Sequence, residues 1–579
     1  MKRILLIILL FVIASVVIGQ VELVPAEHRV YDFLRRMDAK GVIDFNSAVV
    51  PVSRREVATQ LSIMNYELLM KSEGMTSRMS KNDRMMLGDF MKEFEYDLRA
   101  KDIHELRKFD ELHKLENKND SGLENKIGAK KNFVNDNKYI VKYTDTNVAV
   151  WGNLTGGLYL DNGSGDSVGT RKFLSGDLGI EIRGTMFDRV GFAMSYSNGR
   201  VFVGNREDKI FANTYDAFFR TATSLKEDGK FFDHFRGYVR YEVPKRWLSL
   251  MVGKESVKQG FGFVDNLFFS GMVPYSMIKL DVKYKAVGYT FSYGNIKGDS
   301  MGVDVPNKMI STHRLDVKFA KWLRAGFYES VVTSNTAFSF VHFNPLSFIT
   351  SADLNTGGIE TYKSNSLIGF DVEVKPVKNV VLQGTLLVDD FNFATISKND
   401  NTANDNKFGY QAGVMWNDAF MLDGLSGAME YTRLDPFVYA HRDNKQQYTD
   451  WSYSMGHQLP PNSDEVALKF GYNVMPRLSV SLLAQFQRSG EGFEYDSLGN
   501  MVVNFGGNIN YGAMDMYGNK NKFLQGNRVN RSILSFGVRW EPVRQWVLDF
   551  VYRYRMEDLV YASKKGKDGF FYLNFGIKI

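Results

Sequence analysis

The sequence predicts an all-β transmembrane barrel of about eighteen antiparallel strands, with a plugged lumen and a small N-terminal α-helical domain in the periplasm. Three observations predict this fold. A short apolar segment opens the chain, a stretch of helical periodicity follows it, and from about Lys138 onward apolar residues recur at every second position. The connections between the alternating stretches are short and long in turn, which is typical of barrels in a Gram-negative outer membrane.

The first part of the chain has the pattern of an export signal followed by a helical domain. Lys2 and Arg3 precede an apolar run, Ile4 to Ile18, that is short for a membrane-spanning helix. We therefore expect residues 1–20 to be a signal peptide, with an uncleaved anchor helix as the alternative. Residues 21–104 are expected to form a helical periplasmic domain, and residues 105–137 a polar linker rich in charged residues and Asn.

Three helices are expected in residues 21–104. Glu27 to Lys40 is amphipathic and stops at Gly41. Ser53 and Glu56 have the spacing of a capping box at the start of a second helix. A third helix is expected from about Ser80 to Ala100. Three helices of this length can bury one shared core.

Residues 138–579 are expected to form the barrel, from strands of about ten residues, the length that a tilted strand needs to cross a bilayer. In one strand, Leu478, Val480 and Leu482 share a face that alternates with Ser479 and Ser481. The strand cores are expected to start near the following residues: Thr146, Leu178, Arg189, His234, Arg246, Ser276, Gly288, Ser311, Trp322, Asn365, Asn379, Lys407, Leu425, Asp464, Leu478, Arg531, Gln545 and Gly569.

The lengths of the connections favour a barrel over a soluble all-β protein of two or three domains, which is the alternative. Eight short connections, such as Phe187-Asp188 and Pro244-Lys245, alternate with nine long ones, such as 162–177, 332–363 and 556–567. This pattern gives an even number of strands with both chain ends on the short-turn side. Several tryptophans lie beside the short connections, where an aromatic belt would meet the membrane interface; they are Trp247, Trp322, Trp416, Trp540 and Trp546.

Charge and motif content exclude several classes of function. The formal net charge of +6 is too small to indicate nucleic-acid binding, and the absence of cysteine excludes disulfides and thiolate metal sites. The eight histidines have no metal-ligand spacing, and no phosphate loop, dinucleotide motif or nucleophile elbow stands in a matching context. We expect no metal, no cofactor and no enzymatic activity. The best candidate for a barrel hydrolase is His342 with Asn344 and Ser347.

The charged residues that alternate with apolar ones are expected to face the lumen, because a charge at the bilayer midplane costs roughly 2–4 kcal/mol. Both signs occur close together, which favours a cross-linked interior over an ion-selective pore. Two long connections, 261–274 and 338–348, carry unusual aromatic surface and are expected to fold inward as a plug. The residues that we assign to the lumen and the plug are Arg236, Arg240, Arg314, Asp316, Arg553, Phe263 and Phe343.

Several stretches of the chain resemble the Wzi-type capsule-assembly outer-membrane proteins. They are residues 24–34, 51–57, 252–262, 268–274 and 343–348, and the order of signal, helical domain and barrel is similar too. The linker is longer than in that family, and Gly260-Phe-Gly-Phe lacks its tryptophan-rich form. The resemblance implies a lectin-like role in holding exported polysaccharide at the cell surface. The implied partners are surface polysaccharide, outer-membrane lipid including lipopolysaccharide, and the barrel-insertion machinery.

Sugars bind to aromatic faces combined with hydrogen bonds from charged and amide side chains. The long connections offer aromatic residues beside Asn and Asp that could serve in this way: Tyr362, Tyr448, Trp451, Tyr453, Tyr511 and Tyr517. Packing within the loops is the structural alternative for each of them. A diffusion porin or solute channel is the alternative function, because a lumen lined by charges of both signs would also suit passing solutes.

Overall fold

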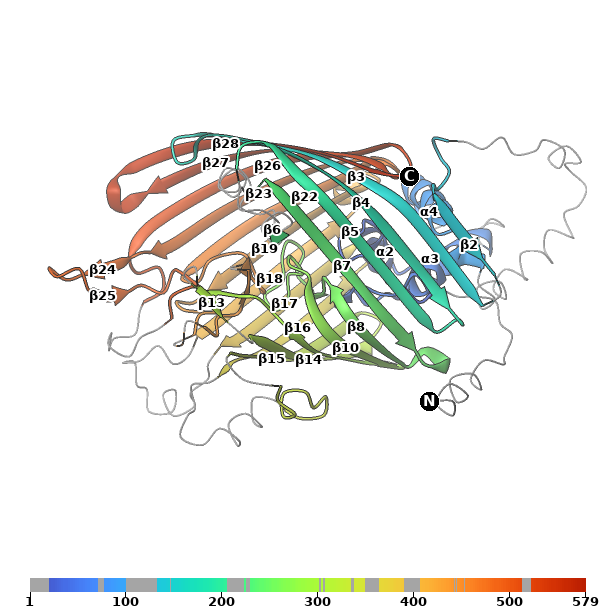
Figure 1. Cartoon of the computed structure of the whole chain (residues 1–579), viewed down its shortest axis with the longest axis horizontal. Helices are drawn as coiled ribbons and strands as arrows, with labels where there is room; N and C mark the ends of the chain where they lie inside the picture. The colour runs from blue at the N-terminus through green and yellow to red at the C-terminus, as the bar shows by residue number, and fades with distance from the viewer. Residues whose placement is uncertain are drawn as a thin grey trace, which may run out of the picture.

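The computed structural model describes residues 20–70, 78–99, 133–145, 147–205, 223–224, 230–300, 303–305, 308–334, 338–348, 364–389, 407–441, 443, 445–451, 453–512 and 522–579. The molecule is a closed, tilted barrel with a cluster of helices at one end (Figure 1). Its strands are β3 (Val148–Gly165), β4 (Gly169–Met186), β5 (Val190–Val203), β7 (Phe231–Glu242), β8 (Leu248–Glu255), β10 (Tyr275–Tyr284), β11 (Val287–Asn295), β14 (Met309–Ala320), β15 (Leu323–Thr333), β16 (Ser364–Val377), β17 (Val380–Asp389), β18 (Lys407–Asn417), β19 (Leu425–Leu434), β22 (Ser463–Met475), β23 (Leu478–Glu491), β26 (Asn527–Val543), β27 (Trp546–Leu559) and β28 (Lys564–Lys578).

Each barrel strand pairs antiparallel with the next, and β28 pairs with β3 to close the ring. The ring therefore has eighteen strands, and the strand number expected from the alternating connections is confirmed. The expected length of ten residues is wrong for several strands. Both β3 and β4 have 18 residues, so the expected loop 162–177 is largely an extended hairpin. Polar residues in this extension continue the backbone ladder past the part that a bilayer can cover.

Side chains alternate between the two faces of the wall as the period of two predicts. Leu315, Phe319 and Phe370 lie exposed on the outer face, whereas Arg314 and Asp371 are buried inside. Trp247, Trp322, Trp416 and Trp540 are exposed beside the short turns. An apolar outer face with aromatic residues at its margin is the surface that a bilayer requires. We call the two ends of the barrel the short-turn end and the long-loop end.

The helical domain consists of α2 (Val30–Ala39), α3 (Arg54–Met70) and α4 (Lys81–Glu93), followed by the 3-10 turn η1 (Asp97–Arg99). Ser53 accepts a hydrogen bond from the Glu56 N–H at 3.2 Å, and Ser80 forms a capping box at the start of α4. The third helix ends earlier than expected, because the tighter η1 turn keeps Leu98 in the core. That core contains Phe33, Leu34, Met37, Leu61, Met64, Leu87, Phe90 and Phe94. Among the described residues, no helix is long and apolar enough to cross a bilayer.

Short pairs of strands complete the fold. β2 (Val141–Thr144) pairs with the start of β3, and β6 (Thr223–Ser224) pairs with β7. At the long-loop end lie the small hairpins β12 (Gly298–Ser300) with β13 (Val303–Val305), β20 (Thr449–Asp450) with β21 (Tyr453–Ser454), and β24 (Phe493–Tyr495) with β25 (Met501–Asn504). The 3-10 turns η2 (Pro244–Arg246) and η3 (Ala419–Met421) lie at the short-turn end, and η5 (Val560–Ala562) joins β27 to β28. Residues 1–19 and 100–132, which hold most of the expected signal peptide and linker, lie outside the described residues.

Candidate functional site

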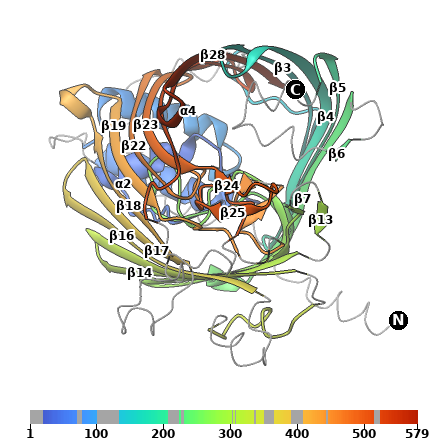
Figure 2. The ribbon, with the colours of Figure 1, turned by 90° about the vertical axis from the view of Figure 1, so that its left-hand side faces the viewer.

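The helical domain covers the short-turn end of the barrel and contacts it around the ring (Figures 1 and 2). Arg324 on β15 binds Asp38 at 2.8 Å and Asp44 at 2.6 Å. On other sides, Arg183 on β4 binds Glu22 at 2.6 Å, and Arg544 beside β26 binds Asp89. Ion pairs on several sides of the ring therefore hold the helical domain in the short-turn end, which it obstructs.

A second obstruction comes from the connection between β8 and β10, residues 256–274, which we call the inward loop. Its strand β9 (Lys258–Gln259) pairs with β1 (Val49–Val50) of the helical domain, with Val49 opposite Gln259. Phe261, Phe263, Phe268 and Phe269 of the loop are buried. The Phe263 N–H donates to Glu430 at 2.7 Å. The structure therefore places Phe263 and its loop inside the barrel, against both the wall and the helices.

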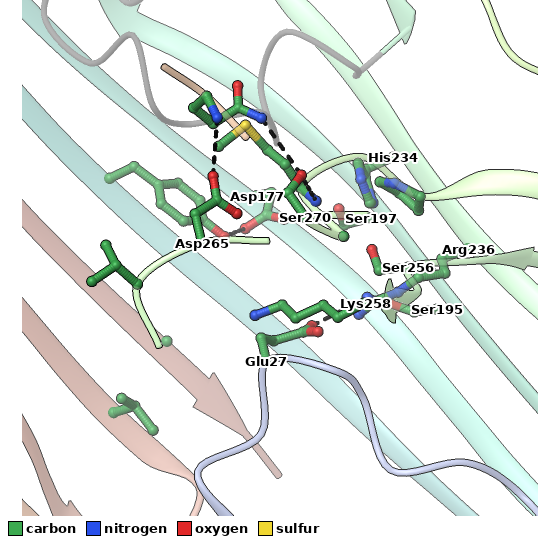
Figure 3. Close-up of a pocket in the computed structure, with 18 of the residues that line it drawn as sticks. Glu27, Asp177, Ser195, Ser197, His234, Arg236, Ser256, Lys258, Asp265 and Ser270 are labelled. Carbon is green, nitrogen blue, oxygen red and sulfur yellow. Dashed lines mark hydrogen bonds and ion pairs between the residues drawn. The ribbon is translucent and has the colours of Figure 1, made fainter. Parts of the chain in front are cut away.

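A cavity of about 770 Å³ remains in the lumen beside the helical domain and the inward loop. Its lining comes from β3, β4, β5, β7, β22, β23, β27 and β28 on the wall, from Glu27, and from the inward loop. Most of the lining residues are polar or charged. Figure 3 labels Asp177, Ser195, Ser197, His234, Arg236, Ser256, Lys258 and Asp265 among them. Glu465, Gln485, Gln487 and Arg553 also line the cavity. This cavity is the candidate functional site.

The charges around the cavity are partly neutralised by one another. Arg236 lies 3.1 Å from a Glu27 oxygen and 3.2 Å from a Glu255 oxygen, and Lys258 lies near this group in Figure 3. Burial disfavours the charged form of Glu27, but the charge and hydrogen bond of Arg236, with a backbone hydrogen bond and the charge of Lys258, together lower the pKa of Glu27. This corner therefore holds a carboxylate and a guanidinium in their charged forms, both able to bond to further hydroxyl groups.

The opposite wall offers amides in place of ion pairs. Gln485 and Gln487 lie two residues apart on β23 and both donate to Glu465 on β22, at 2.9 and 2.6 Å. Because each amide has a second N–H and a carbonyl, the pair retains donors and acceptors for a ligand. Asp265, at the tip of the inward loop, accepts the Gln458 N–H at 3.1 Å, and burial raises its pKa.

In the structure, several of the predicted lumen residues lie on the inner face of the wall, where they bind partners that the sequence did not identify. Arg314 binds Asp371 through both terminal nitrogens at 2.9 Å and Asp316 through Nε at 3.0 Å. Arg240 binds Glu242 at 2.7 Å and the Val21 carbonyl at 3.0 Å. These groups are structural cross-links outside the cavity. Arg236 and Arg553 line the cavity, and Arg553 donates to Ser535 at 3.1 Å.

The aromatic candidates in the long connections do not gather on one face. Tyr448 is fully buried, stacks on Tyr439 and donates to the Phe268 carbonyl at 2.9 Å, so it supports the inward loop. Tyr453 is buried near Trp451, which is partly exposed with Lys297 over its ring. Tyr511 lies on another connection, against Phe493. Tyr362 and Tyr517 lie outside the described residues.

The expectation that residues 338–348 fold inward is wrong. Phe343 packs against Phe291 and Tyr293, which belong to the outward-facing set of β11. The segment lies outside the ring below β14 in Figure 2. An apolar segment can be covered by a lumen plug or by a bilayer, and this segment lies on the bilayer side. The hydrolase candidate, His342 with Asn344 and Ser347, lies in the same segment, where the Ser347 hydroxyl donates to the carbonyls of Val341 and Asn344.

Sequence reasoning did not single out Asp177, His234, Glu465 and Asp265 as site residues. Alternation assigns a residue to the inner face, but it does not say which inner residues lie beside empty space and which beside the helical domain. Asp265, a charged residue within an aromatic loop, is the feature of the sequence that could have indicated a polar site in the lumen. Among the described residues, no group of three or more histidine and acidic side chains is arranged to hold a metal ion.

No protein-family model matches the sequence, and a search of curated proteins finds no match. A solved structure of Wzi from Escherichia coli aligns with 97% of this chain and 99% of its own, at 12% identity and a TM-score of 0.55. It is described as an outer-membrane protein involved in group 1 capsule assembly and as a carbohydrate-binding β-barrel.

Two proteins of Pseudomonas aeruginosa, OprD and OpdK, align with 74% of this chain and with 95% and 99% of their own, at 9% and 7% identity. Their TM-scores of 0.42 and 0.43 are too low to carry an argument. The resemblance to Wzi-type barrels is thus confirmed at the level of the fold: this chain is a closed outer-membrane-type barrel of eighteen strands with helices at its N-terminal side.

Proposed function

We propose that this protein binds polysaccharide at the outer surface of a Gram-negative-type outer membrane and holds it there without catalysing a reaction. The observation that carries the proposal is the polar cavity of about 770 Å³ beside the helical domain and the inward loop, which together occupy much of the lumen. A barrel obstructed in this way is poorly suited to passing solutes. A cavity lined by carboxylates, guanidinium groups, amides and hydroxyls is well suited to the hydroxyl groups of a sugar.

The orientation belongs to the same proposal. Bacterial barrels carry their short turns on the periplasmic side and their long loops outside. We place the helical domain, residues 21–104, in the periplasm, with residues 1–20 acting as a signal peptide and 105–137 as a linker. Insertion by the barrel-assembly machinery and contact with lipopolysaccharide follow from that placement. The fold that the chain shares with Wzi, a carbohydrate-binding barrel, supports the ligand class.

The contacts with sugar are assigned to the cavity first. Gln485, Gln487 and Arg236 supply fixed donors there. Trp451 and Tyr511 are partly exposed and serve in the proposal as stacking surfaces nearer the long-loop end. Tyr448 and Tyr453 are buried, so in this proposal they pack inside the loops and do not contact the sugar.

A binding measurement on purified protein tests the proposal. A panel of bacterial surface polysaccharides is titrated against the wild type and the double variant Gln485→Ala, Gln487→Ala. The double variant should bind about two- to tenfold more weakly for each hydrogen bond lost, as expected for bonds of about 0.5–1.5 kcal/mol. The control is Lys378→Ala, an exposed change at a short turn that should leave affinity unaltered. Equal binding by both variants would move the site out of the cavity.

Cells lacking the gene provide the second test. They should release polysaccharide into the medium that wild-type cells retain, and unchanged retention would contradict the anchoring role. A diffusion porin or solute channel remains the rival function, because the cavity occupies part of the lumen. Swelling of solute-loaded vesicles distinguishes the two, since the proposed binder admits no solute.

A further inference from the structure

Residues 338–348, which we call the outer segment, form a compact turn on the outside of the barrel. The segment belongs to the connection between β15 and β16. Phe338 packs against Tyr293, with ring centroids 5.5 Å apart, and Phe343 packs against Phe291 and Tyr293 at 6.1 and 5.6 Å. Phe348 stacks on Phe327 of β15 at 6.2 Å. The segment is therefore attached to the outward faces of β11 and β15.

The contact between Phe348 and Phe327 places this end of the outer segment below the rim of the long-loop end, whereas Phe338 and Phe343 contact Tyr293, two residues before the end of β11. Phe327 lies five residues along the wall from Trp322, which marks the opposite margin of the apolar band. At about 3.3 Å per residue and a tilt of about 40°, this separation is about 13 Å along the membrane normal. The apolar band of such barrels is about 25 Å tall. Phe348, stacked on Phe327, therefore lies near the middle of the band.

The free side of the outer segment is as apolar as the side that contacts the wall. Phe340 and Leu346 are 82% and 92% exposed. Residues 338–348 contain no acidic residue, lysine or arginine. The neighbouring wall continues the same surface through Leu315, Phe319 and Phe370, which are exposed as well. Among the described residues, the segment adjoins this apolar surface directly, which argues for lipid and against the bounded footprint of a protein partner.

Irregular backbone is normally excluded from hydrocarbon because its polar groups lack partners. In the outer segment every backbone N–H from His342 to Ser347 has an acceptor. The acceptors are Ser339 Oγ for His342, the Ser339 carbonyl for Phe343, the Val341 carbonyl for Asn344, Asn344 Oδ1 for Leu346 and the Asn344 carbonyl for Ser347. Two carbonyls are bonded to the wall, His342 by the Ser311 hydroxyl at 2.6 Å and Pro345 by the Tyr289 hydroxyl. These bonds satisfy part of the backbone of the segment, which lowers the cost of placing it in hydrocarbon.

We propose that the outer segment is embedded in the bilayer and contacts the acyl chains of the leaflet at the long-loop end, which in bacterial barrels is the outer leaflet. It widens the lipid-facing wall between β11 and β15 with side chains that do not come from strands. Its role is to bind lipid, and the inference stands independently of the proposed polysaccharide function.

Site-directed spin labelling of the full-length protein in phospholipid vesicles tests this proposal. The sequence has no cysteine, so Phe340→Cys and Leu346→Cys each give one labelled position. Both side chains are exposed; Leu346→Cys changes the more exposed one, and Phe340→Cys removes an edge-to-face contact with Phe338, so agreement between the two positions controls for that loss. Leu498→Cys, 85% exposed on the β24–β25 hairpin, is the aqueous control, and Phe370→Cys on the bare wall is the lipid control.

Power saturation measures the access of oxygen, which concentrates in lipid, and of a water-soluble nickel chelate. The ratio of oxygen to nickel access at positions 340 and 346 should match that at 370 and exceed that at 498 several-fold. High nickel access at either position would overturn the proposal and place the turn in water. Low access of both reagents would also overturn it, because a second copy or another protein would then cover the segment.

Discussion

Arg314 lies in the barrel wall with its guanidinium between two carboxylates, and none of its side chain reaches solvent. A buried charge of this kind is stable only while its partners remain charged and in place. Asp371, its bidentate partner, is equally enclosed. The three residues on β14 and β16 hold neighbouring parts of the wall together from the inside.

Replacing one carboxylate tests how strongly this cluster stabilises the barrel. Asp371→Ala should lower the free energy of unfolding by about 3–5 kcal/mol, because Arg314 loses its bidentate partner while it stays buried. The matched control is Asp549→Ala, since Asp549 binds Arg539 at 3.0 Å but remains 34% exposed. That change should cost less than about 1 kcal/mol. Urea unfolding in detergent, followed by tryptophan fluorescence, measures both values, and equal losses would contradict the argument.

The sequence predicts on which face of the wall these charged residues lie, but not which of them form ion pairs with each other. The alternation places Arg314 and Asp316 on the same face of a strand. Because a charge in lipid is costly, that face must be the inner one. The pairing of Arg314 with Asp371, 57 positions away, depends on the register of β15 between them. A shift of that strand by one residue would reverse its faces and change every cross-strand neighbour. The sequence contains no local signal that fixes the register to one residue.

Among the elements, the inward loop and the helical domain meet as a two-residue sheet, β1 with β9. This pairing links residues that are 210 positions apart and determines how deeply the loop lies in the lumen. Cysteines introduced at paired positions can report it directly, because directly opposed residues have Cα separations that a disulfide can span.

The double variant Val49→Cys, Gln259→Cys should form a disulfide efficiently under mild oxidation, which changes its mobility on a non-reducing gel. The control is Val49→Cys with Lys258→Cys. Adjacent residues of a strand point to opposite faces, so this second pair should remain largely reduced. Equal yields for the two pairs would mean that the loop does not hold the register described.

The attachment of α4 should depend on pH. Glu93 binds His28 at 2.7 Å, and although burial opposes its charge, His28, Arg29 and Arg544 hold the pKa of Glu93 well below its usual range. A carboxyl with a lowered pKa stabilises the folded state above its unfolded pKa, near 4.5, and this contribution is lost as the pH falls below that value.

Unfolding midpoints measured between pH 7 and pH 3 test this dependence. The free energy of unfolding of the wild type should fall by about 2 kcal/mol or more across the acidic part of the range. That of Glu93→Gln should fall clearly less over the same interval. Glu494→Gln, an exposed change on β24, should follow the wild type. A Glu93→Gln profile parallel to that of the wild type would show that another group controls the response.

The two aromatic connections explain why element placement was predicted only in part. Both 261–274 and 338–348 have too much apolar surface for water, and a filled lumen and a bilayer can each cover such surface. The inward loop contains Asp265, whose carboxylate accepts N–H groups of the lumen. The outer segment has no charged residue to satisfy. That difference was visible in the sequence, but its meaning depends on knowing that the wall at β11 offers an apolar face.

For the whole molecule, the closed ring and the helical domain determine what crosses the membrane through it. Reconstituted in planar bilayers, the protein should give no large, steadily open conductance, because the helical domain and the inward loop obstruct the lumen. An open porin inserted under the same conditions provides the positive control. Steady conductance of porin size would contradict the obstructed interior and would favour the channel function.

The whole-molecule architecture was the most predictable level. Strand number follows from the alternation of short and long connections, because each short turn forces two strands to be neighbours. All eighteen expected strand starts fall at or within a few residues of a barrel strand. The cavity was not predictable, since it is the space left over after the helices and the inward loop have packed, and a small change in either would reshape it.

The closure between β28 and β3 has one further consequence. Their pairing runs from Asp568 opposite Gly165 to Lys578 opposite Thr155, whereas β3 continues back to Val148. Along that remaining stretch β2 takes over as the neighbour of β3, with Val141 opposite Gly152. In a barrel made from one chain, the first and last strands are joined by hydrogen bonds and side-chain contacts but by no connecting turn, so the barrel opens most readily between them. Here β2, which precedes β3 in the chain, pairs with the part of β3 that β28 does not reach. Opening the barrel from this end therefore requires β2 to separate from β3 first.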